Sequence, residues 1–370
     1  MADRSVRPAQ GSEADQGSQR TGWCGAVKPL CLEGLPRELG RAHGVALRQQ
    51  IRSFLDDDLA RLNRVLPRQI GLTTLGPEIA AYRREIAAAA PSLAEEIEGL
   101  AEGAEIAPDE AMLLQIRREV MGYSRLYTAG DCTTLCRRGD DGPVLAQTID
   151  LNGDLEDQMV ILRIAHRSSP RQVLLLSFTG LLGYLGLNSE GLAIGLNLVL
   201  GGTWGPGIPP YLAIRHLLDS CGDIDSCLDW LSRVRLASSR SLLLCDSQRS
   251  VTVELCDGQL SVRAGTTLVH TNHFLSEDFV AMDQMNPFSR NSSVRRLEAC
   301  RAQLDRLGSH GGPEDYMALL CQEPICVSDT GNIRREKTVG AVVMLPKHGM
   351  LHVRRGNPAL ARTEKFCLAA

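Results

Sequence analysis

The spacing of apolar residues divides the chain into a helical first third and a strand-rich remainder. Between Val45 and Leu66, apolar residues recur every three to four positions, as on one face of an amphipathic helix, at Leu47, Ile51, Phe54, Leu55, Leu59, Leu62 and Val65. Two shorter helical patterns span residues 92–104 and 109–121, so the first 130 residues are predicted to be all-helical. Residues 1–22 are rich in Ser, Gln, Gly and charge, and they predict a disordered tail.

The pattern changes at Cys132, after which short apolar runs alternate with Gly, Asp and Pro. Such runs predict strands, which here span residues 143–149, 159–164, 172–178, 184–200 (interrupted by a turn at 188–191), 241–245, 250–255, 267–271, 341–345 and 350–354. Helices are predicted from Pro209 to Leu218, from Asp225 as N-cap to Leu231, and over residues 293–307. This order of strands, helices and further strands indicates a layered α+β domain with its helices outside.

Composition and charge narrow the functional classes. Forty Lys and Arg against 44 Asp and Glu give a net charge of −4, without the basic excess of a nucleic-acid-binding protein. No run approaches about 18 consecutive apolar residues, so neither a transmembrane helix nor a membrane partner is expected. The chain has 12 cysteines and no N-terminal signal peptide, which indicates reduced thiols and a cytoplasmic protein.

The spacing of potential ligands argues against a metal or nucleotide site. The cysteine pairs lack the short paired spacing of structural zinc: Cys132-x3-Cys136, Cys221-x5-Cys227 and Cys321-x4-Cys326. His270 and His273 lie three apart on a predicted strand, where their side chains point to opposite faces. Gly-rich phosphate loops are absent from the sequence. We therefore expect no metal and no bound cofactor.

The segment Asp131-Cys-Thr-Thr134 stands where the helical pattern gives way to strands. A free cysteine is most often a buried core residue, and this is the simplest interpretation of Cys132. A Cys at the start of the first strand of a sheet is also where a self-cleaving precursor places its nucleophile. The segment alone does not decide between the two.

A set of motifs spread along the chain is more specific. In chain order they are Gly40-Arg-Ala-His-Gly44, Glu98-Gly-Leu-Ala-Glu-Gly-Ala104, Arg117-x-Glu119, Asp131-Cys-Thr-Thr134, Gln147-x-x-Asp150, Gly191-Leu-Ala-Ile-Gly-Leu-Asn197, Thr271-Asn-His-Phe274, Ser292-x-x-Arg295 and Thr338. Together they resemble the family of acyl-coenzyme A:isopenicillin N acyltransferase, whose members are self-processing N-terminal-nucleophile amidohydrolases. The resemblance runs from about residue 36 to residue 358.

The resemblance implies a four-layered αββα sandwich in one composite domain. Its mainly helical segment, residues 23–131, is released by cleavage between Asp131 and Cys132, and the nucleophile then begins the sheet-rich segment 132–370. The two chains of one cleaved precursor stay together, and the oligomeric state beyond that is left open.

The resemblance also assigns roles to single residues. Cys132 is the nucleophile, and its freed α-amine, with an ordinary pKa of about 7.7 to 8.0, is the general base. Asp150 holds that amine, and Asn197 and Asn272 form the oxyanion hole. Arg295 meets a substrate carboxylate. Tyr184 and Trp204 line an acyl pocket.

Departures from the family pattern bear on the substrate. Val339 follows Thr338 where the penicillin enzyme has Arg, and Gln147 stands where bile-salt and penicillin V hydrolases usually carry Arg. Asp131 replaces Gly before the nucleophile, and Gln115 replaces Asn. With Arg295 as the main remaining cation, we expect a small N-acyl amino acid or peptide-like amide as the substrate.

Several alternatives remain open at this point. One alternative is a non-processing binding or scaffold protein of the same fold. Another is an amide hydrolase of the penicillin V or bile-salt type. A third is a thiol hydrolase in which His43 or His273 is the base for Cys132. Hydrolysis and acyl transfer share one acyl-enzyme, so the sequence does not separate them. Coenzyme A, as a thioester acyl donor, is implied only by the resemblance.

Overall fold

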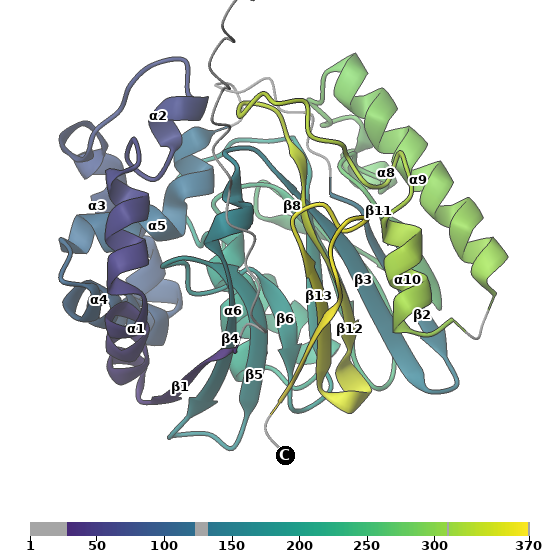
Figure 1. Ribbon diagram of the computed structural model, residues 1–370, viewed down its shortest axis with the longest axis horizontal. Helices are drawn as coiled ribbons and strands as arrows, with labels where there is room; N and C mark the ends of the chain where they lie inside the picture. The colour runs from purple at the N-terminus through teal and green to yellow at the C-terminus, as the bar shows by residue number, and fades with distance from the viewer. Residues whose placement is uncertain (1–27, 123–131, 309–310, 369–370) are drawn as a thin grey trace, which may run out of the picture.

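Two β-sheets stack face to face between two layers of helices. The computed structural model describes residues 28–122, 132–308 and 311–368, so the expected tail and Asp131 lie outside the described residues. Figure 1 shows the N-terminal helices beside the larger sheet and the helices α9 and α10 on the outer face of the smaller sheet. This arrangement confirms the expected αββα sandwich.

The apolar pattern predicted three helices in the N-terminal segment, and the described part of that segment has five. Its helices are α1 (Pro36–Asp56), α2 (Leu62–Val65), α3 (Leu72–Ala89), α4 (Pro91–Ala104) and α5 (Pro108–Met121). The prediction of a continuous helix over residues 45–66 was wrong, because residues 58–61 all have positive φ, between 50° and 60°. Consecutive left-handed residues end a right-handed helix. Arg61 fixes this turn through Asp57 at 2.8 Å and Asp157 at 2.6 Å.

The prediction that the first 130 residues are all-helical was also wrong. The strand β1 (Leu30–Gly34) pairs in parallel with β4 (Met159–His166) at the edge of the larger sheet. Leu32 is buried while its neighbours Cys31 and Glu33 are exposed, which is the alternation of a strand with one covered face. Such a short run gave too little periodicity to be recognised.

The larger sheet has the strand order β1-β4-β5-β6-β7-β8-β9-β10. Its further strands are β5 (Gln172–Phe178), β6 (Leu185–Asn188), β7 (Ala193–Leu198), β8 (Arg240–Cys245), β9 (Ser250–Cys256) and β10 (Gln259–Ala264). The helix α6 (Pro210–Ser220) packs on β5, β6 and β7. It is joined to α4 by Arg215, whose buried guanidinium binds Glu96 at 2.8 Å. After α6, α7 (Ile224–Leu231) is capped by Asp223 rather than by the predicted Asp225.

The smaller sheet has the order β11-β2-β3-β12-β13-β14. These strands are β2 (Thr134–Gly139), β3 (Gly142–Leu151), β11 (Thr267–His270), β12 (Lys337–Leu345), β13 (Met350–Arg355) and β14 (Glu364–Cys367). The helices at this end of the chain are α8 (Glu277–Val280), α9 (Pro287–Leu307) and α10 (Pro313–Leu320). A stripe of Leu297, Cys300 and Leu304 on α9 packs against this sheet. Within the described ranges, no helix is long and apolar enough to cross a membrane.

Two of the motifs near the N-terminus serve helix packing rather than chemistry. Gly40 and Gly44 on α1 face Gly99 and Gly103 on α4. A β-carbon at Gly40 would lie 1.9 Å from the carbonyl oxygen of Glu96, and one at Gly99 would lie 2.1 Å from that of Arg37. The four-residue spacing puts each glycine pair on one helix face, and the missing side chains let the two backbones touch.

The two sheets are joined by side chains near the site. Gln147 on β3 is fully buried, and its Oε1 accepts a hydrogen bond of 2.9 Å from the backbone N–H of Leu196 on β7. The hydroxyl of Thr134 donates to the carbonyl of the same Leu196 at 3.3 Å. These contacts hold the end of β7, and with it Asn197, opposite the start of β2.

Candidate functional site

Cys132 lies two residues before β2, between the two sheets, and only 6% of it is exposed. Its Sγ is 3.5 Å from the backbone N–H of Asp150, which donates to it, and 3.7 Å from the Asp150 carbonyl oxygen. Asp150 lies near the end of β3. Its Oδ2 accepts from Thr148 Oγ1 at 3.3 Å, and the same hydroxyl accepts from the Thr133 N–H at 3.0 Å. The thiol and this carboxylate are therefore held by neighbouring strands of one sheet.

The carbonyl oxygen of Cys132 is held by two donors from distant parts of the chain. Asn197 Nδ2 and Arg296 Nη1 each donate to it at 2.9 Å. Arg296 is fully buried and also donates to Thr133 Oγ1 at 3.1 Å and to Asn272 Oδ1 at 2.8 Å. One Nδ2 hydrogen of Asn197 is thus engaged by the main chain of Cys132, and Asn197 is not among the described residues that line the cavity beside Cys132.

Asn272 is the amide that faces the cavity beside Cys132. Its backbone N–H donates to Ser293 Oγ at 2.8 Å, and its Nδ2 donates to the Leu198 carbonyl at 2.9 Å. An amide Nδ2 carries two hydrogens, and these bonds fix its orientation. One Nδ2 hydrogen is used by the Leu198 carbonyl, and the side chain lines the same cavity as Cys132.

The arginine expected in the site was assigned one residue too early. Arg295 is exposed on α9, whereas Arg296 is buried and reaches Cys132. The sequence Ser-Ser-Val-Arg-Arg fits the Ser-x-x-Arg motif in two registers, and the structure uses Ser293 with Arg296. The apolar stripe of α9 at Leu297 and Cys300 carries the signal for this choice, because Arg296 falls on the same face.

Cys132 lines a cavity of about 420 Å³, the inner chamber. Its lining combines charged, polar and apolar side chains: Arg118, Cys132, Asp150, Leu151, Asn152, Tyr184, Leu196, Leu198, Tyr211, Arg240, Asn272 and Glu336. Tyr184 is 2% exposed, and its ring centroid lies 4.8 Å from that of Tyr211, with the two rings tilted by 41°. Burial raises the pKa of Tyr184 well above its usual value, and the charges of Cys132 and Asp150 raise it further. Tyr184 is therefore a neutral residue in the wall of the chamber.

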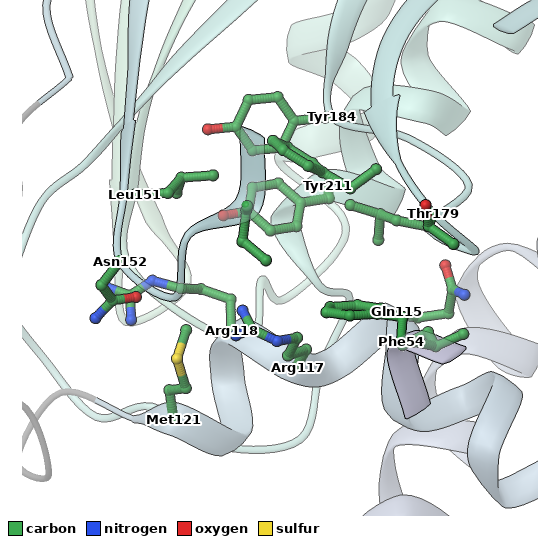
Figure 2. Close-up of a pocket in the computed structure, with 14 residues that line it drawn as sticks. Phe54, Gln115, Arg117, Arg118, Met121, Leu151, Asn152, Thr179, Tyr184 and Tyr211 are labelled. Carbon is green, nitrogen blue, oxygen red and sulfur yellow. The ribbon is translucent and has the colours of Figure 1, made fainter. Parts of the chain in front are cut away.

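An outer chamber of about 510 Å³ shares Arg118, Leu151, Asn152, Tyr184 and Tyr211 with the inner one. Most of its remaining lining is apolar: Phe54, Leu114, Met121, Leu155, Phe178 and Leu181. Figure 2 shows Arg117 and Arg118 at one side of this chamber, with Tyr184 and Tyr211 across it. The helical segment thus supplies one wall of the cavity and the sheets supply the other.

Other residues singled out in the sequence lie away from the two chambers. Neither His43 nor His273 lines them. His43 is fully buried in α1, and His273 Nδ1 binds Ser293 Oγ at 2.8 Å. Trp204, expected in an acyl pocket, is not among the lining residues and binds Ser239 Oγ at 3.1 Å instead. Val339 is buried in β12.

The sequence analysis did not predict several of the lining residues, which include Arg118, Asn152, Tyr211, Arg240 and Glu336. Neighbouring arginines on a helix are typical of a solvated face, so Arg118 was not predicted to line a site, although Arg117 belongs to the motif Arg117-x-Glu119. The signal was present in the neighbouring residues, because α5 is apolar on every side around the pair. A helix surrounded by apolar positions is buried, and its arginines with it.

Comparisons with known proteins identify the family of the chain. The sequence model of the acyl-coenzyme A:6-aminopenicillanic acid acyl-transferase family matches residues 137–360, more than half of the chain. The 40 kDa form of acyl-coenzyme A:6-aminopenicillanic-acid acyltransferase from Emericella nidulans is 26% identical over 277 residues, which cover 72% of this chain and 76% of that protein.

Among solved structures, an N-acylethanolamine-hydrolyzing acid amidase ortholog of Caenorhabditis elegans is similar over 64% of this chain and 100% of its own, with 16% identity and a TM-score of 0.47. Penicillin V acylase of Agrobacterium tumefaciens is similar over 60% of this chain and 82% of its own, with 14% identity and a TM-score of 0.44. The family match rests on the sequence and covers both sheets. The chain belongs to the acyl-coenzyme A:6-aminopenicillanic acid acyl-transferase family.

Proposed function

We propose that the protein is a self-processing cysteine amidohydrolase or acyltransferase that cleaves a small amide through a thioester on Cys132. The observation that carries this proposal is the placement of the Cys132 thiol on the wall of a buried cavity, next to Asp150 and Asn272. The clamp of Asn197 and Arg296 on the Cys132 carbonyl supports it. A core cysteine needs none of these partners.

The first reaction is the cleavage of the precursor. The thiol of Cys132 adds to the carbonyl carbon of Asp131 and loses its proton. The bond between that carbon and the Cys132 nitrogen breaks, and the nitrogen leaves as an amine. Water then hydrolyses the thioester, which frees both the thiol and the α-amine of Cys132.

The freed amine serves as the base for turnover. An α-amino group titrates near 7.7 to 8.0, so a substantial fraction is neutral near neutral pH and accepts the thiol proton. Asp150 holds this amine, while its backbone N–H, 3.5 Å from Sγ, stabilises negative charge on the sulfur. Nucleophile and base then belong to one residue, which fits a site whose described lining contains no histidine.

Acyl transfer then proceeds through a tetrahedral oxyanion. The thiolate adds to the substrate carbonyl, and the second Nδ2 hydrogen of Asn272 donates to the developing oxyanion. The intermediate expels the amine, which takes the proton from the α-amine of Cys132. Water or a second amine then attacks the thioester and releases the acyl group.

The outer chamber supports an apolar acyl group. Phe54, Leu114 and Phe178 line it together with other apolar side chains, so it removes apolar surface from water. Whether water or an amine takes the acyl group depends on which of them reaches the thioester. The role of coenzyme A as an acyl donor is inferred only by analogy with the family name.

The test is to trap the acyl-enzyme. Processed protein is mixed with an N-acyl amide and quenched in acid, and the mass of each chain is measured. The proposal expects the acyl mass on the chain that begins at Cys132 and none on the Cys132→Ala protein. An acyl group on another residue, or turnover by Cys132→Ala, would contradict the role of Cys132. A protein that neither cleaves itself nor is acylated would favour the binding or scaffold alternative.

A further inference from the structure

Three buried N–H groups without an acceptor line the outer chamber of the cavity. They are Arg117 Nη2, Arg118 Nη1 and Asn152 Nδ2, and none has a hydrogen-bond partner in the part of the chain that the structure describes. Each arginine is 8% exposed, and Asn152 is 4% exposed. Figure 2 shows both guanidinium groups leaving α5 on the side of the cavity, with Arg118 extended toward Asn152. Buried donors are normally paired, so three of them around one cavity require an explanation.

The arginines are held in place without being neutralised. Arg117 Nε donates to the Ala60 carbonyl at 2.7 Å, and its Nη2 lies 3.0 Å from where a β-carbon would stand at Gly153. Arg118 makes neither an ion pair nor a hydrogen bond with the described residues. The neighbouring carboxylate, Glu119, accepts from Ser238 at 2.9 Å and lies 3.4 Å from Arg240. Asp150 and Glu336, the acids that line the inner chamber with Arg118, do not line the outer one.

The charges of the lining point to an anionic ligand. No Asp or Glu is found among the described residues that line the outer chamber. Burial lowers the pKa of Arg117 to about 10, and the charge of Arg118 lowers it further in the same direction. A buried cation without a counter-ion is costly, and an anion in the chamber would offset that cost for both arginines.

We propose that Arg117, Arg118 and Asn152 form the binding site for the carboxylate of the substrate. This inference rests on the proposed function, because it places the anion relative to an amide held at Cys132. Arg118 and Asn152 line both chambers, so the carboxylate lies where the chambers meet, close to the scissile amide. The substrate class is then an N-acyl amino acid, with its carboxylate at Arg118 and its acyl chain along the apolar wall.

The first experiment compares one substrate with and without its charge. The processed protein is given N-octanoylglycine and its methyl ester, and octanoate release is measured. For the wild type we expect kcat/KM to be about ten- to hundredfold higher for the acid than for the ester. Charge-assisted hydrogen bonds contribute binding energy of this size in other proteins. Arg118→Gln should abolish this preference, so that the variant uses the acid and the ester with similar kcat/KM. Arg295→Gln, which removes an exposed arginine, should behave like the wild type. Equal use of both compounds by the wild type would overturn the inference.

The second experiment measures binding without turnover. Cys132 is alkylated with iodoacetamide in the presence of octanoate or octanol, and the rate at Cys132 is followed by peptide mass. The wild type is expected to be protected by octanoate at concentrations at least about tenfold lower than by octanol. Arg118→Gln, or Asn152→Leu if the first variant does not fold, should remove the difference.

The two experiments separate the two claims. Selective protection by octanoate without cleavage of either amide would contradict the proposed function and leave the anion site standing. Cleavage of both amides with equal protection by octanoate and octanol would overturn the anion site alone.

Discussion

Arg296 Nη1 donates to the carbonyl oxygen of Cys132 at 2.9 Å, across 164 positions of sequence. The arginine comes from α9, in the outer helical layer, and the cysteine lies just before β2 in the inner sheet. This bond ties the main chain of Cys132 to α9, which also contacts Asn272 through Ser293 and Arg296. The position of the thiol therefore depends on how α9 packs.

Replacing Arg296 tests this dependence. We expect Arg296→Gln to lower kcat by about a hundredfold, because a displacement of the nucleophile by about 1 Å has an effect of that size. KM should change by less than about threefold, since Arg296 is absent from the lining of the two chambers. Steady-state kinetics on one N-acyl amide measures both constants. Arg295→Gln is the matched control, since the same change on the exposed neighbour should leave both constants within about twofold. An equal loss of kcat in the two variants would mean that the positive charge of α9 supports activity, and not the bond from Arg296 to Cys132.

Asn272 has a different role in this account, as the donor to the oxyanion. Asn272→Ala should lower kcat by about 10² to 10³. The variant also leaves Arg296 Nη2 and the Leu198 carbonyl without their partner, which costs about 1 to 3 kcal/mol of stability. Denaturant unfolding and kinetics on the same samples separate the two effects. If Asn272→Ala kept nearly full kcat, the role of Asn272 as the donor to the oxyanion would be contradicted.

Most strands of the larger sheet could be predicted from the sequence, but the position of the arginine that contacts Cys132 could not. Strands such as β5 and β8 are short apolar runs between turn residues, so their pattern identifies them. The motif Ser-x-x-Arg fits both Arg295 and Arg296, and only packing against the sheet decides between them. The strand β1 was not predicted, because its partner, β4, lies more than 120 residues away in the sequence. Strand pairing across such a separation leaves no local signal in the sequence.

The buried arginines illustrate a second limit of sequence analysis. Arg117 and Arg118 look like ordinary surface residues of a helix when they are considered alone. Their burial becomes evident only when the apolar residues on every side of α5 are considered together with them. Asn197 was also expected to face the substrate, whereas the structure turns it toward Cys132.

The close contact of α1 and α4 predicts a large effect from a small substitution. In Gly40→Ala the new methyl group would lie 1.9 Å from the Glu96 carbonyl oxygen, so the helices must separate. We expect a loss of about 1 to 3 kcal/mol in the free energy of unfolding, as in other overpacked cores. Gly205→Ala is the control, because a β-carbon there meets nothing within 4 Å, and it should change stability by less than about 1 kcal/mol. Urea unfolding of both variants measures the difference, and similar stability of the two would contradict the packing role of Gly40.

His43 predicts a specific pH dependence of stability. Burial lowers its pKa to about 4, and the charge of Arg215 contributes in the same direction. An unfolded histidine titrates near 6.5, so between about pH 6.5 and 4 the unfolded state binds a proton that the folded state does not. The stability associated with His43 is therefore present above about pH 6.5 and is lost as the pH falls toward about 4.

The variant His43→Gln isolates this contribution. Between about pH 6 and 4.5 its free energy of unfolding should fall less steeply than that of the wild type, by up to about 1.4 kcal/mol per pH unit. Urea unfolding at several pH values measures the two slopes. The acidic residues titrate in both proteins, so the difference between the slopes reports His43. Parallel slopes would mean that His43 is protonated in the folded protein.

The central claim is that Cys132 becomes the N-terminus of a separate chain. The most direct measurement is the intact mass of purified wild-type protein and of Cys132→Ala, each incubated and then denatured. From a chain of 370 residues, cleavage after Asp131 leaves 131 residues and 370 − 131 = 239 residues. The account predicts these two masses for the wild type, from chains that copurify before denaturation, and one uncut chain for Cys132→Ala. A wild-type protein that remains a single uncut chain after prolonged incubation, or a Cys132→Ala protein that is cut at the same bond, would contradict it.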